Sequence, residues 1–497
     1  MVYNMKVIII GATNAAVTAA ARLRRLDEKV EIIIIDHRRT VPEIRLGRLQ
    51  DSYNVVVRLG MKAVWDDEAQ DSLVCEDLVS GEVTSEKFDK IVFSYEVDGD
   101  SVAHAHRGPR NSFVLSNPAA LERSWNDIAT YMIASSTKTA EVRGNDLIAF
   151  MAVARLIDAK ILTIHRVVNM PPQSPHVPDL DKDVAAHIIA HLVSRGMHIG
   201  DVMDAHDPTP MSDGIIVDCV NHVPQLPEFV QPADNKQAAQ EFPLDTIVTN
   251  KFTGERADAP QLSQKRGRDL AAVVLGYSDS NADSEESVNL RSVDLLGKRL
   301  TTFGLTEHEL NRRGMKHIFS VVPIGDGFLK LIYNDLGQIL GFAALAASPN
   351  PTKYADMLAM FVQLGGMVHK LANAELSDDM SAVIALGKIA QNVLEKRLEM
   401  AYWDEIEHVD MEKTILLDVR GEREYATGSI PNAINIPLAD LRIRQYLLDE
   451  TKEVIVFCDS GRDSYVAARI LAGCGMKVRH LTGGLAYCGV LLKEVIL

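Results

Sequence analysis

Residues 6–36 read KVIIIGATNAAVTAAARLRRLDEKVEIIIID, and this stretch decides the class of fold. Strand formers at residues 7–10 stop at Gly11, an alanine-rich helical stretch follows, and EIIIID forms a second apolar run. A strand, a tight turn, a helix and a second strand in this order are typical of a βαβ unit with parallel strands. The stretch therefore predicts an α/β fold.

The same pattern returns in residues 139–166, with Gly144 at the turn and ILTIHR as the closing strand. Two such units predict two nucleotide-type domains. Between them, residues 72–94 alternate apolar and polar side chains around Ser80 and Gly81, which predicts a β-hairpin or meander. Residues 181–196 have helical spacing and lead into the strand GIIVDCV.

The C-terminal half has a different pattern. Residues 293–395 contain the strand-like runs HIFSVVPI, FLKLIYN and GQILGFAALA, followed by two helical stretches, which predicts an α+β module. From Trp403 onward, ILLDVR, EVIVFC and KVRHL alternate with helical stretches, as in a small α/β domain. We place a boundary loop at the acidic residues 278–288. The domains we predict are 1–120 with 241–285, 121–240, 290–398 and 403–497.

Composition and charge restrict the function. The 497 residues are 47% hydrophobic and include 68 acidic and 52 basic side chains, a formal charge of −16, which disfavours nucleic acid and anionic membranes as partners. Residues 7–21 have the look of a signal peptide, but they continue into a helix and a second strand, so we interpret them as part of the fold. We find no apolar stretch long enough for a transmembrane helix.

The cysteines and histidines give no metal site. Five cysteines without a CxxC pair suggest neither a disulfide framework nor a zinc site, and they favour a reducing cytoplasm. We interpret His104 and His106 as part of a solvated loop. The five cysteines are Cys75, Cys219, Cys458, Cys474 and Cys488.

These segments together resemble the flavin- and nicotinamide-dependent disulfide reductases of the coenzyme A disulfide reductase type that carry a C-terminal rhodanese domain. The similarity is strongest in residues 6–36, in FLKLIYNDLGQILGFAAL (328–345) and in LLDVRGEREYATGSIPNAINIPLADLR (416–442). It implies two Rossmann-like dinucleotide-binding domains, an α+β dimerisation domain, a C-terminal rhodanese-like α/β domain, and a homodimer formed through residues 293–395.

In this family the first turn holds the flavin pyrophosphate at a helix N-terminus. Gly11 and Ala16 keep the first and last positions of that turn, and Asp36 stands where an acidic residue would hold the ribose hydroxyls. The alternative, a βαβ unit that packs and binds nothing, stays open. Glu96 and Asn250 replace residues of the family's flavin site, so we expect FAD to be bound weakly or lost.

The other ligand sites are also altered. Gly144 keeps one position of the nicotinamide turn, but Asp146 lies near the expected pyrophosphate. Arg166 would suit the 2′-phosphate of NADPH, or it is a solvated surface residue. Arg22 and Arg25, three apart on the first helix, match the face that meets coenzyme A phosphates in the family, with a solvated basic face as the alternative.

The redox cysteine of the family has no counterpart here. Counting from Asp36, the family's cysteine segment becomes residues 42–47, and the cysteine becomes Leu46. Leucine has no thiol, so thiol–disulfide exchange is chemically excluded at this position. The tyrosine segment that a second subunit contributes in the family is missing as well, at residues 376–379.

The rhodanese-like end keeps more of its family's features. Cys458 ends the strand VIVF and opens a loop before a helix, where backbone N–H groups and the helix dipole stabilise a thiolate or a persulfide. Asp418 and Arg420 match the family's structural Asp-Val-Arg. Arg462 stands one place before the usual arginine, which is Asp463 here. The alternative is that Cys458 is a small buried hydrophobe, as we expect for Cys474 and Cys488.

Three functions remain open at this stage. The first is a reductase-family protein that has lost disulfide reduction and whose rhodanese domain transfers or senses sulfane sulfur from a small sulfur-containing substrate. The second is an FAD- and NAD(P)H-dependent oxidoreductase without a redox cysteine. The third is a non-enzymatic partner that forms mixed dimers with an intact reductase.

Overall fold

The computed structural model divides into two compact units, Met1–Asp127 with Val220–Glu286, and Ile128–Cys219 with Ser287–Leu497. The finer boundaries of the four expected domains stay a prediction. The described residues are 4–41, 46–65, 72–94, 112–115, 118–144, 147–161, 163–167, 180–195, 199–200, 214–219, 247–249, 260–277, 288, 290–348 and 351–492.

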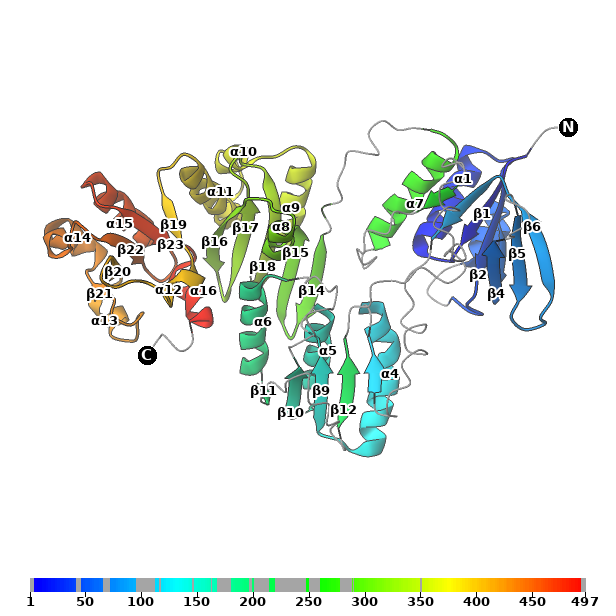
Figure 1. The fold of residues 1–497 in the computed structure, drawn as a ribbon, viewed down its shortest axis with the longest axis horizontal. Helices are drawn as coiled ribbons and strands as arrows, with labels where there is room; N and C mark the ends of the chain where they lie inside the picture. Colours follow the sequence, from blue (N-terminus) through cyan, green and yellow to red (C-terminus); the bar gives the residue numbers. More distant parts are fainter. Residues whose placement is uncertain are drawn as a thin grey trace. The chain divides into compact units, whose positions relative to one another are not determined.

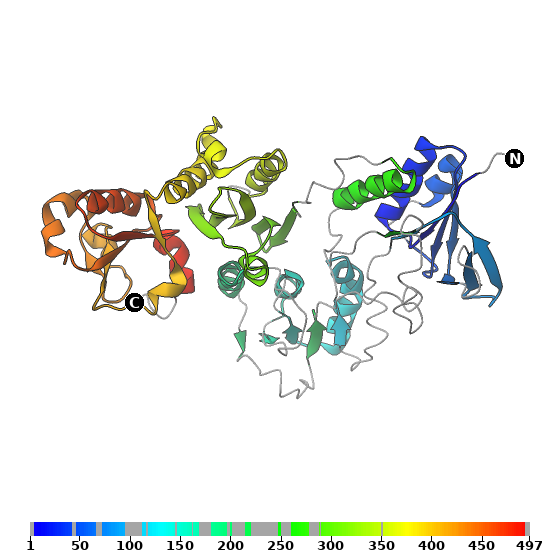
Figure 2. The ribbon, with the colours of Figure 1, turned by 45° about the horizontal axis from the view of Figure 1, so that its top comes forward.

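The first unit contains a parallel sheet in the order β13-β7-β1-β2-β3. Figures 1 and 2 show the helices α1 and α7 lying side by side against it. Val7 and Ile9 contribute to the core that contains residues of α1 and α7, because alternate residues of a strand point to opposite faces. The elements are β1 (Lys6–Ile10), α1 (Asn14–Leu26), β2 (Glu31–Asp36), α2 (Leu46–Tyr53), β3 (Val56–Leu59), β7 (Lys90–Phe93), β13 (Ile247–Thr249) and α7 (Pro260–Val274).

A three-stranded antiparallel sheet covers the opposite face. Ile8 and Ile10 pack with residues of this sheet, such as Leu73 and Cys75. Its strands are β4 (Met61–Trp65), β5 (Ser72–Asp77) and β6 (Val83–Lys87). The predicted hairpin is confirmed for β5 and β6, whereas β7 joins the parallel sheet. β8 (Ser112–Val114) and α4 (Pro118–Ser135) follow in the chain.

The second unit begins with the second predicted βαβ unit, which is confirmed. Its strands β11, β10, β9 and β12 are parallel, and α5 packs against β9. The elements are β9 (Thr139–Arg143), α5 (Leu147–Asp158), β10 (Thr163–Val167), α6 (Lys182–Ser194), β11 (Ile199–Gly200) and β12 (Ile215–Asp218). The chain thus has two Rossmann-like folds.

The α+β module is an antiparallel sheet in the order β14-β15-β18-β17-β16. Leu329, Leu331 and Tyr333 on β17 share a core with residues of α9, α10 and α11. The elements are β14 (Arg291–Leu295), β15 (Lys298–Gly304), α8 (Glu307–Arg312), β16 (Ile318–Ile324), β17 (Gly327–Tyr333), β18 (Ile339–Ala346), α9 (Thr352–Gln363), α10 (Val368–Ala372), η3 (Asp378–Met380) and α11 (Ser381–Leu394).

The C-terminal domain is a parallel sheet in the order β19-β23-β22-β20-β21. Residues of α14 and α15 share a core with this sheet. The elements are β19 (Glu399–Ala401), α12 (Trp403–Ile406), β20 (Thr414–Asp418), α13 (Glu422–Tyr425), β21 (Ile434–Asn435), α14 (Leu438–Arg444), η4 (Gln445–Leu447), β22 (Glu453–Phe457), α15 (Arg462–Gly473), β23 (Val478–Leu481) and α16 (Gly484–Leu491).

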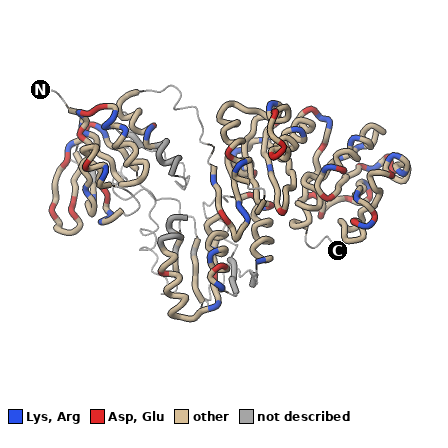
Figure 3. Tube along the Cα trace, turned by 180° about the vertical axis from the view of Figure 1, so that it is seen from behind, with Lys and Arg blue, Asp and Glu red and all other residues tan. Residues whose placement is uncertain are grey.

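Lys and Arg residues and Asp and Glu residues are both distributed along each unit (Figure 3). In the part of the chain that the structure describes, none of the helices has both the length and the apolar character needed to cross a bilayer.

Candidate functional site

Cys458 lies at the end of the central strand β22, directly before the loop that leads into α15. The strand is buried because Val454 to Phe457 lie in the middle of a parallel sheet. Gly461 closes the loop at φ +86°, a conformation that glycine adopts without strain. The cysteine thus stands at the N-terminal end of a twelve-residue helix, as the sequence predicts.

Two backbone N–H groups and one hydroxyl surround the Cys458 sulfur. Gly461 N lies 3.2 Å and Ser464 N 3.4 Å from Sγ, and both donate to it, while Ser464 Oγ lies 3.3 Å away. The side chain of Cys458 is only 2% exposed. Backbone donors at a helix N-terminus stabilise a sulfur anion, so this arrangement can hold a thiolate or a persulfide.

Main-chain hydrogen bonds from α16 also hold the loop. Leu485 N–H donates to the carbonyl of Cys458 at 2.9 Å, and Ala486 N–H donates to that of Asp459 at 2.9 Å. A Cβ at Gly484 would lie 2.4 Å from the Asp459 oxygen, so only glycine allows this approach.

His480 holds the loop from β23. Its Nε2 lies 3.0 Å from the carbonyl of Gly461, to which the neutral ring donates. Burial lowers the pKa of His480 to about 4, although this hydrogen bond opposes the shift. Among the described residues its Nδ1 has no hydrogen-bond partner. His480 is therefore a buried neutral histidine at physiological pH.

Acid should destabilise the rhodanese-like domain through this histidine. The folded pKa lies below that of an exposed imidazole, so the stability is complete above about pH 6.5 and is lost as the pH falls toward 4. We expect a loss of about 2 kcal/mol at pH 5 relative to neutral pH. Urea unfolding at both pH values measures it. His480→Gln should remove this part of the pH dependence, whereas His408→Gln, at an exposed position, should retain it.

The three charged residues that follow Cys458, namely Asp459, Arg462 and Asp463, are all exposed. In the described part of the chain the hydrogen bonds to Sγ come from Gly461 and Ser464. That Arg462 replaces the family's loop arginine in catalysis stays a prediction. Ser464 carries the contact that sequence reasoning missed, although its place six residues after the cysteine, in the first turn of the helix, was a usable signal.

Asp418, the last residue of β20, and Arg420 form the expected structural pair. Arg420 donates to both carboxylate oxygens of Asp418 at 2.8–3.1 Å, and Ser429 Oγ donates to Oδ2 at 2.7 Å. Arg420 also donates to the carbonyl of Gly428. These contacts hold the turn after β20.

The turn between β1 and α1, to which we assign the flavin pyrophosphate, brings Gly11 close to Asp36, but the Asp36 carboxylate is already hydrogen-bonded within the protein. Gly11 has a φ of +99°, and Ala16 N–H donates to Thr13 Oγ1 at the start of α1. Each carboxylate oxygen of Asp36 accepts two hydrogen bonds. Oδ1 accepts from the backbone N–H and from Nε of Arg38, and Oδ2 accepts from the backbone N–H of Ala12 and from the terminal guanidinium nitrogen of Arg38. Although burial raises the pKa of Asp36, these bonds hold it below the usual range. Ribose hydroxyls would have to displace a donor.

Gly144 has a structural reason of its own. Its φ is +119°, and a Cβ there would lie 3.0 Å from the carbonyl of Cys219. The positive φ and the close approach of Cys219, the residue after β12, therefore favour glycine at position 144 whether or not a dinucleotide binds. Arg22 and Arg25 are both exposed on α1, and their contact with coenzyme A phosphates stays a prediction.

Leu46 begins α2 and packs against the core of the first unit. A partly buried helical leucine thus stands at the position to which the family resemblance assigns the redox cysteine. Several other predicted positions lie outside the described residues, or have side chains that are not described. They are residues 42–45, Glu96, His104, His106, Asp146, Arg166 and Asn250.

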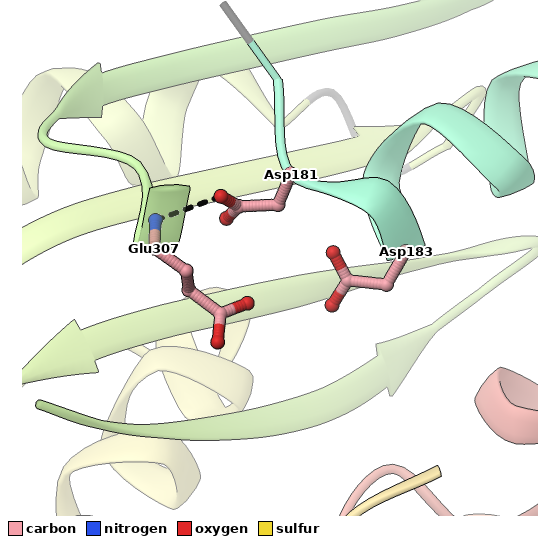
Figure 4. Close-up of side chains that lie close together, drawn as sticks. All are labelled: Asp181, Asp183 and Glu307. Carbon is pink, nitrogen blue, oxygen red and sulfur yellow. Dashed lines mark hydrogen bonds between the residues drawn. The ribbon is translucent and has the colours of Figure 1, made fainter. Parts of the chain in front are cut away.

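Sequence reasoning missed a buried ion cluster in the second unit. Lys330 on β17 is fully buried, and its Nζ contacts Asp181 at 3.1 Å, Asp183 at 2.6 Å and Glu307. Figure 4 shows the three carboxylate side chains converging, with Glu307 N–H donating to Asp181 at 2.7 Å. Three carboxylates this close resemble a cation site, and here the ammonium group of Lys330 supplies the charge. A lysine inside the apolar run FLKLIY was the signal.

A family model described as a rhodanese-like domain matches residues 403–487. A sulfurtransferase of Allochromatium vinosum is 35% identical over 77 residues, which cover 15% of this chain and 72% of that protein. The chain belongs to the rhodanese-like family through this domain. A tRNA sulfurtransferase of Desulfurococcus amylolyticus is also 35% identical to it, over 85 residues that cover 17% of each chain.

Solved structures match the architecture of the whole chain. The crystal structure of reduced Bacillus anthracis CoADR-RHD has a TM-score of 0.78 at 21% identity and covers 100% of this chain and 99% of its own. An NAD-dependent persulfide reductase from A. fulgidus has a TM-score of 0.74 at 18% identity, covering 97% and 100%. The expected fold is therefore confirmed, with two Rossmann-like domains, an α+β domain and the rhodanese-like domain. At these identities the likeness shows the fold alone.

Proposed function

We propose that the chain transfers sulfane sulfur through Cys458. The observation that carries this proposal is the set of donors from Gly461 and Ser464 around Sγ at the start of α15. The thiolate attacks the outer sulfur of a donor such as thiosulfate, the S–S bond of the donor breaks, and sulfite leaves with the electron pair. An acceptor thiolate or cyanide then takes the outer sulfur of the persulfide and restores the Cys458 thiolate.

Asp463 should slow this reaction with anionic donors. Asp463 is exposed in the first turn of α15, directly after residues 459–461, which we call the sulfur loop. Together with Asp459 it outweighs the single positive charge of Arg462. Asp463→Arg should raise kcat/KM for thiosulfate by about two- to tenfold, because the anionic donor and the persulfide meet less negative charge. Asp410→Arg, at an exposed site on another loop, is the matched control. An equal gain in both variants would point to a nonspecific charge effect.

For the reductase-like part, we propose that disulfide reduction has been lost. Leu46 supports this, since a leucine at the start of α2 cannot form a mixed disulfide. The hydrogen bonds that the Asp36 carboxylate already accepts support the proposal that FAD is bound weakly or not at all. We also propose that the altered turn after Gly144, with Asp146 near the expected pyrophosphate, weakens NAD(P)H binding.

The second candidate is an FAD- and NAD(P)H-dependent oxidoreductase without a redox cysteine. A water-forming NADH oxidase from Lactobacillus brevis shares the fold of the first part, with a TM-score of 0.57 at 13% identity over 79% of this chain and 100% of its own.

The visible spectrum decides between these candidates. We expect the purified chain to lack the yellow flavin absorbance, or to lose it on dialysis against buffer, because Arg38 and Ala12 already donate four hydrogen bonds to the Asp36 carboxylate. Retained, stoichiometric FAD would make NAD(P)H oxidation the leading function.

We further propose a homodimer formed through residues 293–395, in a cytoplasmic protein, with coenzyme A contacts at Arg22 and Arg25. A mixed dimer with an intact reductase is the non-enzymatic alternative. Light scattering on the purified chain should give twice the mass of one chain, and a monomer at micromolar concentration would contradict the homodimer.

A further inference from the structure

Residues 482–488, which we call the bridging segment, contact the start of the sulfur loop through main-chain groups. The N–H groups of Leu485 and Ala486 bind the carbonyls of Cys458 and Asp459, each at 2.9 Å. Because a trans peptide is planar, a fixed carbonyl also fixes the direction of the next N–H group. The N–H groups of Asp459 and Ser460 therefore point away from α16. The two peptides to which they belong lead from Cys458 to Ser460, directly before Gly461, whose N–H donates to Sγ, so the position of α16 constrains this donor.

Side chains of the same segment reach the α+β module and α6. Tyr487 Oη donates to Asp183 Oδ2 at 2.5 Å, and its ring stacks on His187 at 4.5 Å between centroids. Thr482 Oγ1 accepts from Val321 N–H of β16 at 2.9 Å. Tyr487 is 1% exposed, so its hydroxyl cannot exchange this partner for water.

The acceptor of Tyr487 belongs to the Lys330 cluster. Burial raises the pKa of Asp183, but Lys330 and the Tyr487 hydroxyl hold it below the usual range. Burial raises the pKa of Tyr487 well above its usual value, so the hydroxyl keeps its proton. The bond is a charge-assisted hydrogen bond between a protonated phenol and a carboxylate held by Lys330.

We propose that Tyr487 is a positioning residue for Cys458. Its hydrogen bond to Asp183 anchors α16 on the Lys330 cluster, and α16 in turn sets the backbone of the loop that surrounds the sulfur. This inference rests on the proposed sulfur transfer for its kinetic meaning, but the positioning itself is a property of the loop. Thr482 supplies the second anchor of the same segment.

The test uses the full chain in its reduced form, with Tyr487→Phe, Thr482→Val and the control Tyr333→Phe. Tyr333 is an equally buried tyrosine whose hydroxyl lies 2.9 Å from Ser320 Oγ. Iodoacetamide alkylation of the Cys458 peptide is followed by mass spectrometry from pH 5 to 9, which separates it from the exposed Cys474. Steady-state rates are measured with thiosulfate and cyanide.

We expect Tyr487→Phe to move the pH midpoint of Cys458 alkylation upward by about 0.5 unit or more, and to lower kcat about three- to tenfold at unchanged KM. Thr482→Val should likewise raise the alkylation midpoint and lower kcat, and it tests the positioning of Cys458 if Tyr487→Phe does not fold. Tyr333→Phe should leave both unchanged. A Tyr487→Phe protein with an unshifted midpoint, or a Tyr333→Phe protein with the same shift, would overturn the proposal. If the wild type transfers no sulfur, the proposed function fails, while the alkylation midpoints still test the positioning.

Discussion

Replacing Cys458 with serine abolishes sulfur transfer from thiosulfate or a persulfide donor to cyanide or a thiol. We expect a fall of at least about a thousandfold, to the uncatalysed rate, because a serine hydroxyl stays protonated at neutral pH and forms no persulfide. The donors at Gly461 and Ser464 remain in place, so the loss comes from the missing sulfur. Thiocyanate formation by the full-length protein measures it.

Cys474→Ser is the matched control. The expectation of a buried packing residue is confirmed for Cys488 but wrong for Cys474, which is exposed. Cys474 directly follows α15, at the opposite end of that helix from the donors of the loop, so this variant should keep wild-type activity. If the wild type is inactive with every sulfur donor and Asp463→Arg is equally inactive, the domain is better interpreted as a binding module. The mixed-dimer hypothesis would then lead.

Replacing Lys330 with methionine destabilises the second unit by about 3–5 kcal/mol at neutral pH. The methionine keeps most of the apolar volume, but Asp181, Asp183 and Glu307 lose the ammonium group that all three contact. Urea unfolding followed by circular dichroism measures the free energy. The loss should shrink between pH 8 and pH 5, since carboxylates without a cation have folded pKa values above the unfolded ones and take up protons as the pH falls.

Lys353→Met provides the comparison for a surface ion pair. Lys353 lies 3.4 Å from Asp379, whose side chain is 81% exposed, so the change should be small and independent of pH. A Lys330→Met protein as stable as Lys353→Met would contradict a structural role for the cluster.

More of the geometry around Cys458 than of the proposed dinucleotide sites could be predicted from the sequence. A persulfide loop is a local feature in which the strand, Cys458, Gly461 and the helix follow one another in the chain, so its geometry follows from residue spacing. The turn after β1 also has local spacing, with Gly11 at its start and Ala16 in the first turn of α1, while its role in flavin binding stays a prediction. The partner of Asp36 was not foreseen although Arg38 stands only two residues away, because residue spacing does not specify that its guanidinium folds back onto the carboxylate.

The sequence by itself determined the two βαβ units, the α+β module, the C-terminal α/β domain and the place of Cys458 before a helix. These features depend on hydrophobic periodicity and turn residues, which act over a few positions. Only the tertiary structure decided the partners of Lys330 and Tyr487. Asp181 lies 149 positions from Lys330, and Asp183 lies 304 positions from Tyr487. Such pairs form because folding buries charges that must then be compensated, and no local pattern specifies which distant group does so.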